Sequence, residues 1–197
     1  MAIADVVDRL GSDRDTLNKW VGVYVGLLAV LLAICNVGGA NATKDAMRAH
    51  IEAANTWAFF QAKNIRRNTT TIAADDLELM REALATMPPE VQKKFTDKIA
   101  AYREQAKRLT TDPERKEGLD ELFQKGRALE AERDVAFRKD PYFDWSQALL
   151  QIAIVLASVH LIIGNRSLLA LSAALGAGGI LLMLNGFTLA VNIPFLS

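Results

Sequence analysis

The sequence predicts an all-α membrane protein with three transmembrane helices and an extramembrane antiparallel helical, coiled-coil-like domain between the first and second. Three uncharged apolar runs, over residues 21–37, 147–163 and 167–191, are the first observation. A helix needs roughly 20 apolar residues to cross the hydrocarbon core, and lipid forces such a segment to pair its backbone internally. The second observation is that residues 44–144 hold 19 of the 23 Lys and Arg and 19 of the 23 Asp and Glu.

These boundaries divide the chain into five segments. An amphipathic tail comes first, and we expect a short interfacial helix over residues 2–10 that is broken at 11–13. The first apolar run begins late and follows an acidic flank, so we expect it to stay as an anchor rather than to be cleaved. The predicted segments are the tail 1–19, transmembrane helix 20–38, charged helical domain 39–144, and transmembrane helices 145–164 and 167–191.

Small residues mark two of the predicted spans as packing surfaces. Gly22 and Gly26 begin a stripe that Ala29 and Ala33 continue along one face of the first span. Such stripes let two helix backbones approach closely in lipid, although Gly and Ala are also simply frequent in membrane helices. The third span has a denser cluster around Gly176, which predicts a close helix contact. Only residues 164–166 join the last two spans, so they form an antiparallel hairpin.

The charged domain carries helical periodicity throughout. We expect a helix from about 40 to 68, loosened by the threonines at 69–71, and a short helix capped by Asp75 or Asp76. Pro88 and Pro89 then separate it from a helix over 89–109, and a fourth helix runs to about 139, where Asp140 and Pro141 end it. The first of these helices carries a heptad seam that packs within the chain or between copies: Met47, Ile51, Ala54, Ala58, Gln61 and Ile65.

One stretch of the first helix, residues 54–66, reads ANTWAFFQAKNIR. It resembles the signature W-x-[FY]-[FY]-Q-A-K-x-[IV]-[KR] of a bacterial domain-of-unknown-function family of small membrane proteins. The resemblance extends over nearly the full chain and implies an anchor span, this motif, a charged helical insert and a C-terminal pair of spans with a short basic turn. It implies no activity. The turn here holds only Arg166, fewer basic residues than the family pattern.

The motif itself allows two interpretations. Trp57 and Gln61 share a helix face with Phe60 beside them, which favours helix packing, since a large aromatic next to an amide fixes register. The alternative is a ligand or lipid-headgroup site, with the aromatic rings as walls and Lys63 and Arg66 as anion contacts.

Polar residues inside the spans suggest a second alternative. Asn36, His160 and Asn185 lie one in each apolar run. Ionisable residues inside a membrane are candidates for function, so several copies could line a polar path with them. The simpler interpretation is that each of these side chains forms a hydrogen bond with a nearby backbone group or with a neighbouring helix.

Several classes of protein are disfavoured. The net charge is zero, so no basic field is available for nucleic acid. Cys35 is the single cysteine and there are two histidines, which disfavours metal sites, and no nucleotide-binding or hydrolase motif is present. We therefore expect no enzymatic activity, no cofactor and no metal.

The predicted function is a structural, assembly or accessory subunit that self-associates or docks on a membrane complex through its helical domain. The alternative is a small oligomeric channel or transporter. The expected partners are the lipid bilayer and a second copy or another membrane protein. We expect a multi-pass protein of the bacterial inner membrane. The basic residues of the short loops favour a cytoplasmic N-terminus and a periplasmic helical domain.

Overall fold

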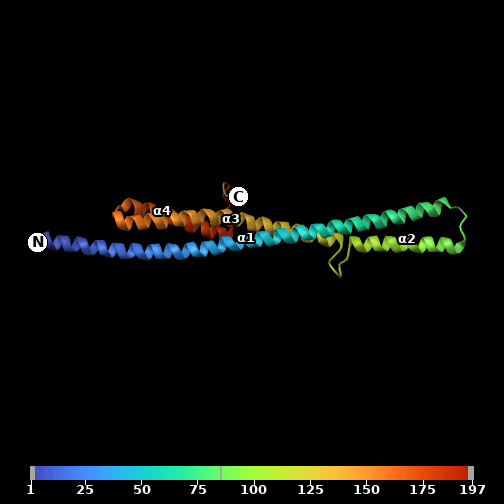
Figure 1. The fold of residues 1–197 in the computed structure, drawn as a ribbon, viewed down its shortest axis with the longest axis horizontal. Coiled ribbons are helices and arrows are strands. Elements are labelled where there is room, and N and C mark those ends of the chain that lie inside the picture. The colour runs from blue at the N-terminus through green and yellow to red at the C-terminus, as the bar shows by residue number, and fades with distance from the viewer. Residues whose placement is uncertain (1–2, 85, 195–197) are drawn as a thin grey trace. The chain divides into compact units, whose positions relative to one another are not determined.

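The computed structural model describes residues 3–84 and 86–194, with side chains from residue 16 onward. These described residues form four α-helices and no strand, which confirms the all-α prediction (Figure 1). The helices are α1 (Ile3–Ala83), α2 (Pro89–Thr110), α3 (Leu119–Ile163) and α4 (Arg166–Thr188).

Three of the helices are long and apolar enough to cross a membrane. Their most apolar windows reach mean hydropathies of 2.3 in α1, 2.0 in α3 and 2.1 in α4. The prediction of three candidate spans is therefore confirmed. The first differs in kind from the expected short anchor, because the helix that contains it extends over 68 described residues from Thr16 to Ala83.

The continuity of α1 corrects three predicted interruptions. The break at 11–13, the loosening at 69–71 and the new helix start at Asp75 are all wrong, since α1 is helical throughout. The threonines lie within the helix, and their hydroxyls donate to backbone carbonyls four residues earlier, Thr70 Oγ1 to Arg66 O at 2.8 Å for example. The predicted apolar face of the N-terminal tail lies outside the described side chains.

The continuity of α3 corrects a fourth prediction. Pro141 lies inside the helix instead of ending it. Proline removes one backbone donor and usually breaks a helix interior. Here the two residues that follow it, Tyr142 and Phe143, are almost fully buried, so their packing offsets the lost hydrogen bond. The fourth predicted helix and the second predicted span are thus one element, which begins at Leu119.

The chain divides into two compact units. Unit 1 comprises the described residues of 1–46 and 134–197, and unit 2 comprises residues 47–133. In unit 1 the first part of α1 packs with the second part of α3 and with α4. The buried core of unit 1 is Leu28, Cys35, Ala42, Phe143, Leu150, Ala153 and Met183.

Small residues bring the helices of unit 1 together. A Cβ at Gly38 would lie 2.6 Å from the Phe143 ring, so only glycine fits at that point of α1. On α4, Gly179 packs against Leu150, and its carbonyl accepts a hydrogen bond from Ser146 Oγ at 2.7 Å. The small-residue cluster of the last predicted span therefore forms a close helix contact, as expected.

Unit 2 pairs the second part of α1 with α2 and then with the start of α3. Figure 1 shows α2 folded back antiparallel to α1, and Arg103 of α2 contacts Glu78 and Asp75 of α1 at 2.6 and 3.1 Å. These contacts raise the pKa of Arg103, chiefly through its hydrogen bond to Glu78. α2 and α3 contribute the following buried residues to unit 2: Ile99, Leu109, Leu119, Leu122, Gly126 and Leu129.

The face of α1 that unit 2 buries consists of small residues. We name it the inner seam, and its members are spaced by three or four residues or their sums: Ala49, Ala53, Thr56, Thr70 and Ala74. The predicted heptad seam lies elsewhere on the helix and is exposed to the surroundings of the chain. Together with its continuation we name it the outer seam: Met47, Ile51, Ala54, Ala58, Gln61, Ile65, Asn68, Ile72 and Leu79.

Candidate functional site

The sequence motif lies on α1 within unit 2 and presents three different faces. Trp57 and Phe60 point toward α3, Phe59 and Lys63 line a cleft beside α2, and Gln61 lies on the outer seam. Consecutive helical residues are about 100° apart, so a short motif reaches every side of its helix. The candidate functional site is therefore a set of surfaces around one turn of α1, and we describe them in order.

The first surface is an aromatic cluster. Trp57 makes edge-to-face contacts with Phe60 of α1 and Phe123 of α3, each with ring centroids 5.6 Å apart. Pairs in this geometry contribute about 0.5–1.5 kcal/mol beyond the burial of their area. Trp57 and Phe60 therefore pack inside unit 2, and a role for them in packing against a partner stays a prediction.

A glycine and a carboxylate complete this cluster. Gly126 lies directly beneath the indole, where a Cβ would lie 2.8 Å from Trp57 ring atoms. The indole Nε1 donates to Glu130 Oε1 at 3.0 Å, and Arg127 contacts the other oxygen of Glu130 at 3.4 Å. The tryptophan is thus fixed in both its apolar and its polar part.

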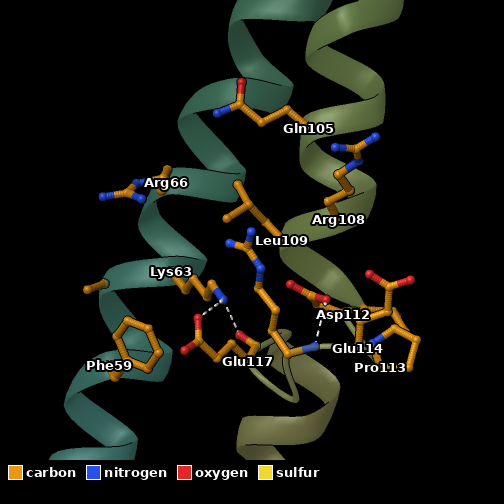
Figure 2. A pocket seen from close by; sticks show the side chains of 13 residues that line it. Phe59, Lys63, Arg66, Gln105, Arg108, Leu109, Asp112, Pro113, Glu114 and Glu117 are labelled. Atoms are coloured by element: carbon orange, nitrogen blue, oxygen red, sulfur yellow. Dashed lines mark hydrogen bonds and ion pairs between the residues drawn. The ribbon is translucent and has the colours of Figure 1, made fainter.

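The second surface is a cleft of about 750 Å³ between α1, the end of α2 and the connection to α3 (Figure 2). Lys63 is its most enclosed cation, with 12% of its side chain exposed. The Lys63 ammonium donates to the backbone carbonyl of Glu117, lies 3.9 Å from the Glu117 carboxylate, and sits over the Phe59 ring at 5.2 Å. Lys63 therefore fastens the α2–α3 connection onto α1.

The charges around the cleft are of both signs. Its lining includes the cations Lys63, Arg66, Arg108 and Arg115 and the acids Asp112, Glu114 and Glu117. Figure 2 shows the Arg66 and Arg108 side chains extending outward on their helices rather than converging. Trp57 is not among the lining residues, so the predicted headgroup site of Trp57, Lys63 and Arg66 is not assembled around this cleft.

The third surface is the outer seam. Its large apolar members are more than half exposed: Met47 62%, Ile51 55%, Ile65 66%, Ile72 59% and Leu79 64%. Gln61 is exposed, and its side chain makes no hydrogen bond to another described residue. Exposed apolar surface that forms a continuous stripe is typical of an interaction site, whereas scattered single residues are not.

The predicted polar residues of the spans occupy three separate places in unit 1. His160 is buried, and its Nδ1 lies 2.8 Å from Asn165 O at the α3–α4 turn. Asn185 bonds both backbone groups of Val191 after the other end of α4, at 2.8 and 2.9 Å. Asn36 is exposed on α1. One copy of the chain therefore does not bring the three side chains together.

The predicted packing glycines divide in the same way. Gly176 is buried in unit 1, where an added Cβ would lie 2.9 Å from the Tyr24 hydroxyl and 3.3 Å from Leu28. At Gly22 and Gly26 an added Cβ would meet nothing within 4 Å. Gly176 serves the chain's own fold, and the stripe that begins at Gly22 is open.

Sequence reasoning missed the partners that fix the motif. Phe123, Glu117 and Glu130 all come from α3 or the connection before it, and no local pattern pairs them with α1. Among the residues whose side chains are described, no group of three His, Cys, Asp or Glu is arranged to hold a metal ion.

Comparison with known proteins finds a family whose model covers nearly the whole chain. A protein-family model described as Domain of unknown function (DUF4337) matches residues 17–189, which is nearly all of the chain. The match includes all three candidate spans and the whole of unit 2. Comparison with the curated proteins and with the solved structures finds no match.

Proposed function

The chain belongs to the family described as Domain of unknown function (DUF4337), and we propose that it is a non-enzymatic membrane protein that assembles with a helical partner through the outer seam. Unit 1 supplies the membrane anchor and unit 2 is the extramembrane helical domain. The observation that supports this most is the exposure of the seam's large apolar residues, from Met47 to Leu79, in the most charged part of the sequence.

The physical reason is the cost of leaving this stripe in water. In unit 1 the outward apolar residues of α1 face lipid if the candidate spans are inserted, and they need no other cover. Lipid cannot cover the apolar residues of unit 2 in the same way, because the helices of unit 2 are too charged to enter the bilayer. Burying apolar area contributes about 25 cal/mol per Å², so covering five half-exposed large side chains is a substantial driving force for association.

We also propose that the membrane is the bacterial inner membrane and that the N-terminus lies in the cytoplasm. Arg9, Arg14, Lys19 and Arg166 lie on the same side of three spans, and short basic loops stay on the cytoplasmic side. Protease added to sealed, right-side-out vesicles then cleaves unit 2 and leaves the 164–166 turn intact. Cleavage at that turn with unit 2 protected reverses the orientation.

Particle mass after gentle extraction tests the assembly. The full chain in mild detergent is expected to run at a mass above one protomer. The variant I51E/I65E, which places charges on the seam, is expected to run as a single protomer. The matched control is Met80→Glu, since Met80 is 55% exposed on α1 but lies off the seam. A single-protomer mass for the unsubstituted chain, both in detergent and after crosslinking in native membranes, would refute the proposal.

A further inference from the structure

We propose that the partner of the outer seam is the outer seam of a second copy, in a parallel, in-register two-stranded coiled coil. This inference deepens the proposed function and rests on it. The choice of a helix, of a second copy and of a parallel register each has its own support in the described residues.

The spacing of the seam identifies the partner as a helix. Ile51, Ala58, Ile65, Ile72 and Leu79 lie seven residues apart, and so do Met47, Ala54, Gln61 and Asn68, which start four residues earlier. An ideal α-helix drifts by about 20° per seven residues, so an unbroken seven-residue repeat stays on one face only if the helix supercoils with another. Lipid or a sheet edge would impose no such period.

The orientation of the anchor favours a parallel pair. Copies of one membrane protein insert with the same orientation, so their α1 helices run in the same direction. Isoleucine at the positions of Ile51, Ile65 and Ile72 is the choice that favours parallel two-stranded coiled coils. In register, Gln61 of one copy meets Gln61 of the other, and an amide pair of this kind fixes register at a cost in stability.

The flanks of the seam fit an identical partner because they carry little charge. Between Met47 and Ile72 the positions beside the seam hold one permanent charge, Arg48, and Glu132 of the same chain binds it at 2.7 Å. Flanks of like charge would repel between identical copies, whereas neutral flanks do not. Asp75 lies seven residues after Asn68 and so continues the spacing of the seam beyond this neutral stretch. Its Oδ1 lies 3.1 Å from the Arg103 guanidinium of the same chain.

The first part of α1 supplies an independent observation. Counted back along the sequence in steps of seven, Met47 leads to Ala40, Ala33 and Gly26. In unit 1 this stripe is exposed, and a Cβ at Gly26 would meet nothing within 4 Å. Small residues on an open face let a like helix approach closely in lipid. The open stripe of unit 1 therefore continues the seven-residue repeat of the outer seam.

Single cysteines in the full chain test the pairing. We compare Ala58→Cys and Ile65→Cys on the seam with Arg66→Cys, since Arg66 is also exposed and directly follows Ile65. The Cα atoms of facing cysteines in an in-register pair lie within the 4.4–6.8 Å that a disulfide allows. Native Cys35 is fully buried, so the unsubstituted chain is the control that is expected to form no disulfide dimer. Under copper–phenanthroline in native membranes, the seam variants are expected to form disulfide dimers at least tenfold faster than Arg66→Cys.

Other outcomes separate this inference from the proposed function. Ile65→Cys and Arg66→Cys could form disulfide dimers at equal rates while the I51E/I65E variant still dissociates the assembled particle. That result would mean that a different helical protein covers the seam. Faster crosslinking in a mixture of Ile51→Cys with Leu79→Cys than in either alone would show an antiparallel pair. Both results overturn the parallel self-pairing and leave assembly through the seam standing. A single-protomer particle overturns both proposals.

Discussion

The inner and outer seams lie on nearly opposite faces of the same helix and differ in almost every property. The inner seam is built from Ala and Thr and is more than nine-tenths buried, and the outer seam carries Ile, Met and Leu and is mostly exposed. A helix packs most closely where its side chains are smallest, so α1 uses alanine to approach α2 and α3. The large residues on the other face have no role in the fold of one chain, and this contrast is the main support for a partner.

The largest effect is expected from removing Trp57, the residue of the motif that packs against α3. Replacing Trp57 by alanine removes the two ring contacts and the bond to Glu130, and truncation of a packed aromatic costs about 3–5 kcal/mol. Hydrogen exchange of the full chain in detergent is expected to lose protection across residues 119–133. The control is Phe59→Ala, because Phe59 belongs to the same motif but is 44% exposed. Equal loss of protection in both variants would contradict the assigned packing role.

Two neighbouring alanines provide a direct test of the two faces. Ala53 is 3% exposed on the inner seam, and Ala54 is exposed on the outer seam. Ala53→Leu overfills a packed contact and is expected to destabilise unit 2 by about 1–3 kcal/mol. Ala54→Leu should leave the fold intact and strengthen assembly. Thermal unfolding and particle mass report the two effects. A destabilising Ala54→Leu with a neutral Ala53→Leu would reverse the assignment of the faces.

The glycines of α1 give a parallel comparison in unit 1. Gly38→Ala forces a Cβ to within 2.6 Å of the Phe143 ring, so overpacking of about 1–3 kcal/mol is expected. Gly26→Ala meets nothing within the chain and gains helix propensity of up to about 1 kcal/mol. The midpoint of thermal unfolding in mild detergent should fall for the first variant and hold or rise for the second. Particle mass is expected to show weaker assembly for Gly26→Ala, because the open stripe lets the α1 helices of two copies approach closely. Unchanged assembly would contradict that contact.

The smallest expected effect concerns the ion pairs that join α2 to α1. Arg103→Gln removes the contacts with Glu78 and Asp75, both of which are exposed. Exposed ion pairs contribute little to stability, and salt screens them. Hydrogen exchange in α2 should quicken slightly at low ionic strength and match the unsubstituted chain in high salt. A large effect that persists in salt would mean that Arg103 acts through packing instead.

Periodicity and apolar length were enough to predict an all-α chain with three candidate spans, but they divided α1 and α3 into several shorter helices. α2 buries Ile99 and Leu109, because the apolar stripe of an amphipathic helix must face its neighbours. The interruptions were mispredicted because they rested on local signals. Pro141 and the threonines at 69–71 disfavour a helix interior by themselves, yet both segments are helical in the folded chain, where Thr70 and the two residues after Pro141 are buried.

The candidate site shows the same division. A heptad count from Met47 to Ile65 found the outer seam without any structure, because spacing along a helix fixes which residues share a face. The sequence by itself could not say whether that face turns inward or outward, since a regular apolar stripe suits a core and an interface equally. Only the tertiary structure decided this, by placing small residues against α2 and α3 and leaving the large ones uncovered. Which faces of a helix are buried is set by contacts between residues far apart in the chain, as with Trp57 and Gly126, and no local pattern encodes them.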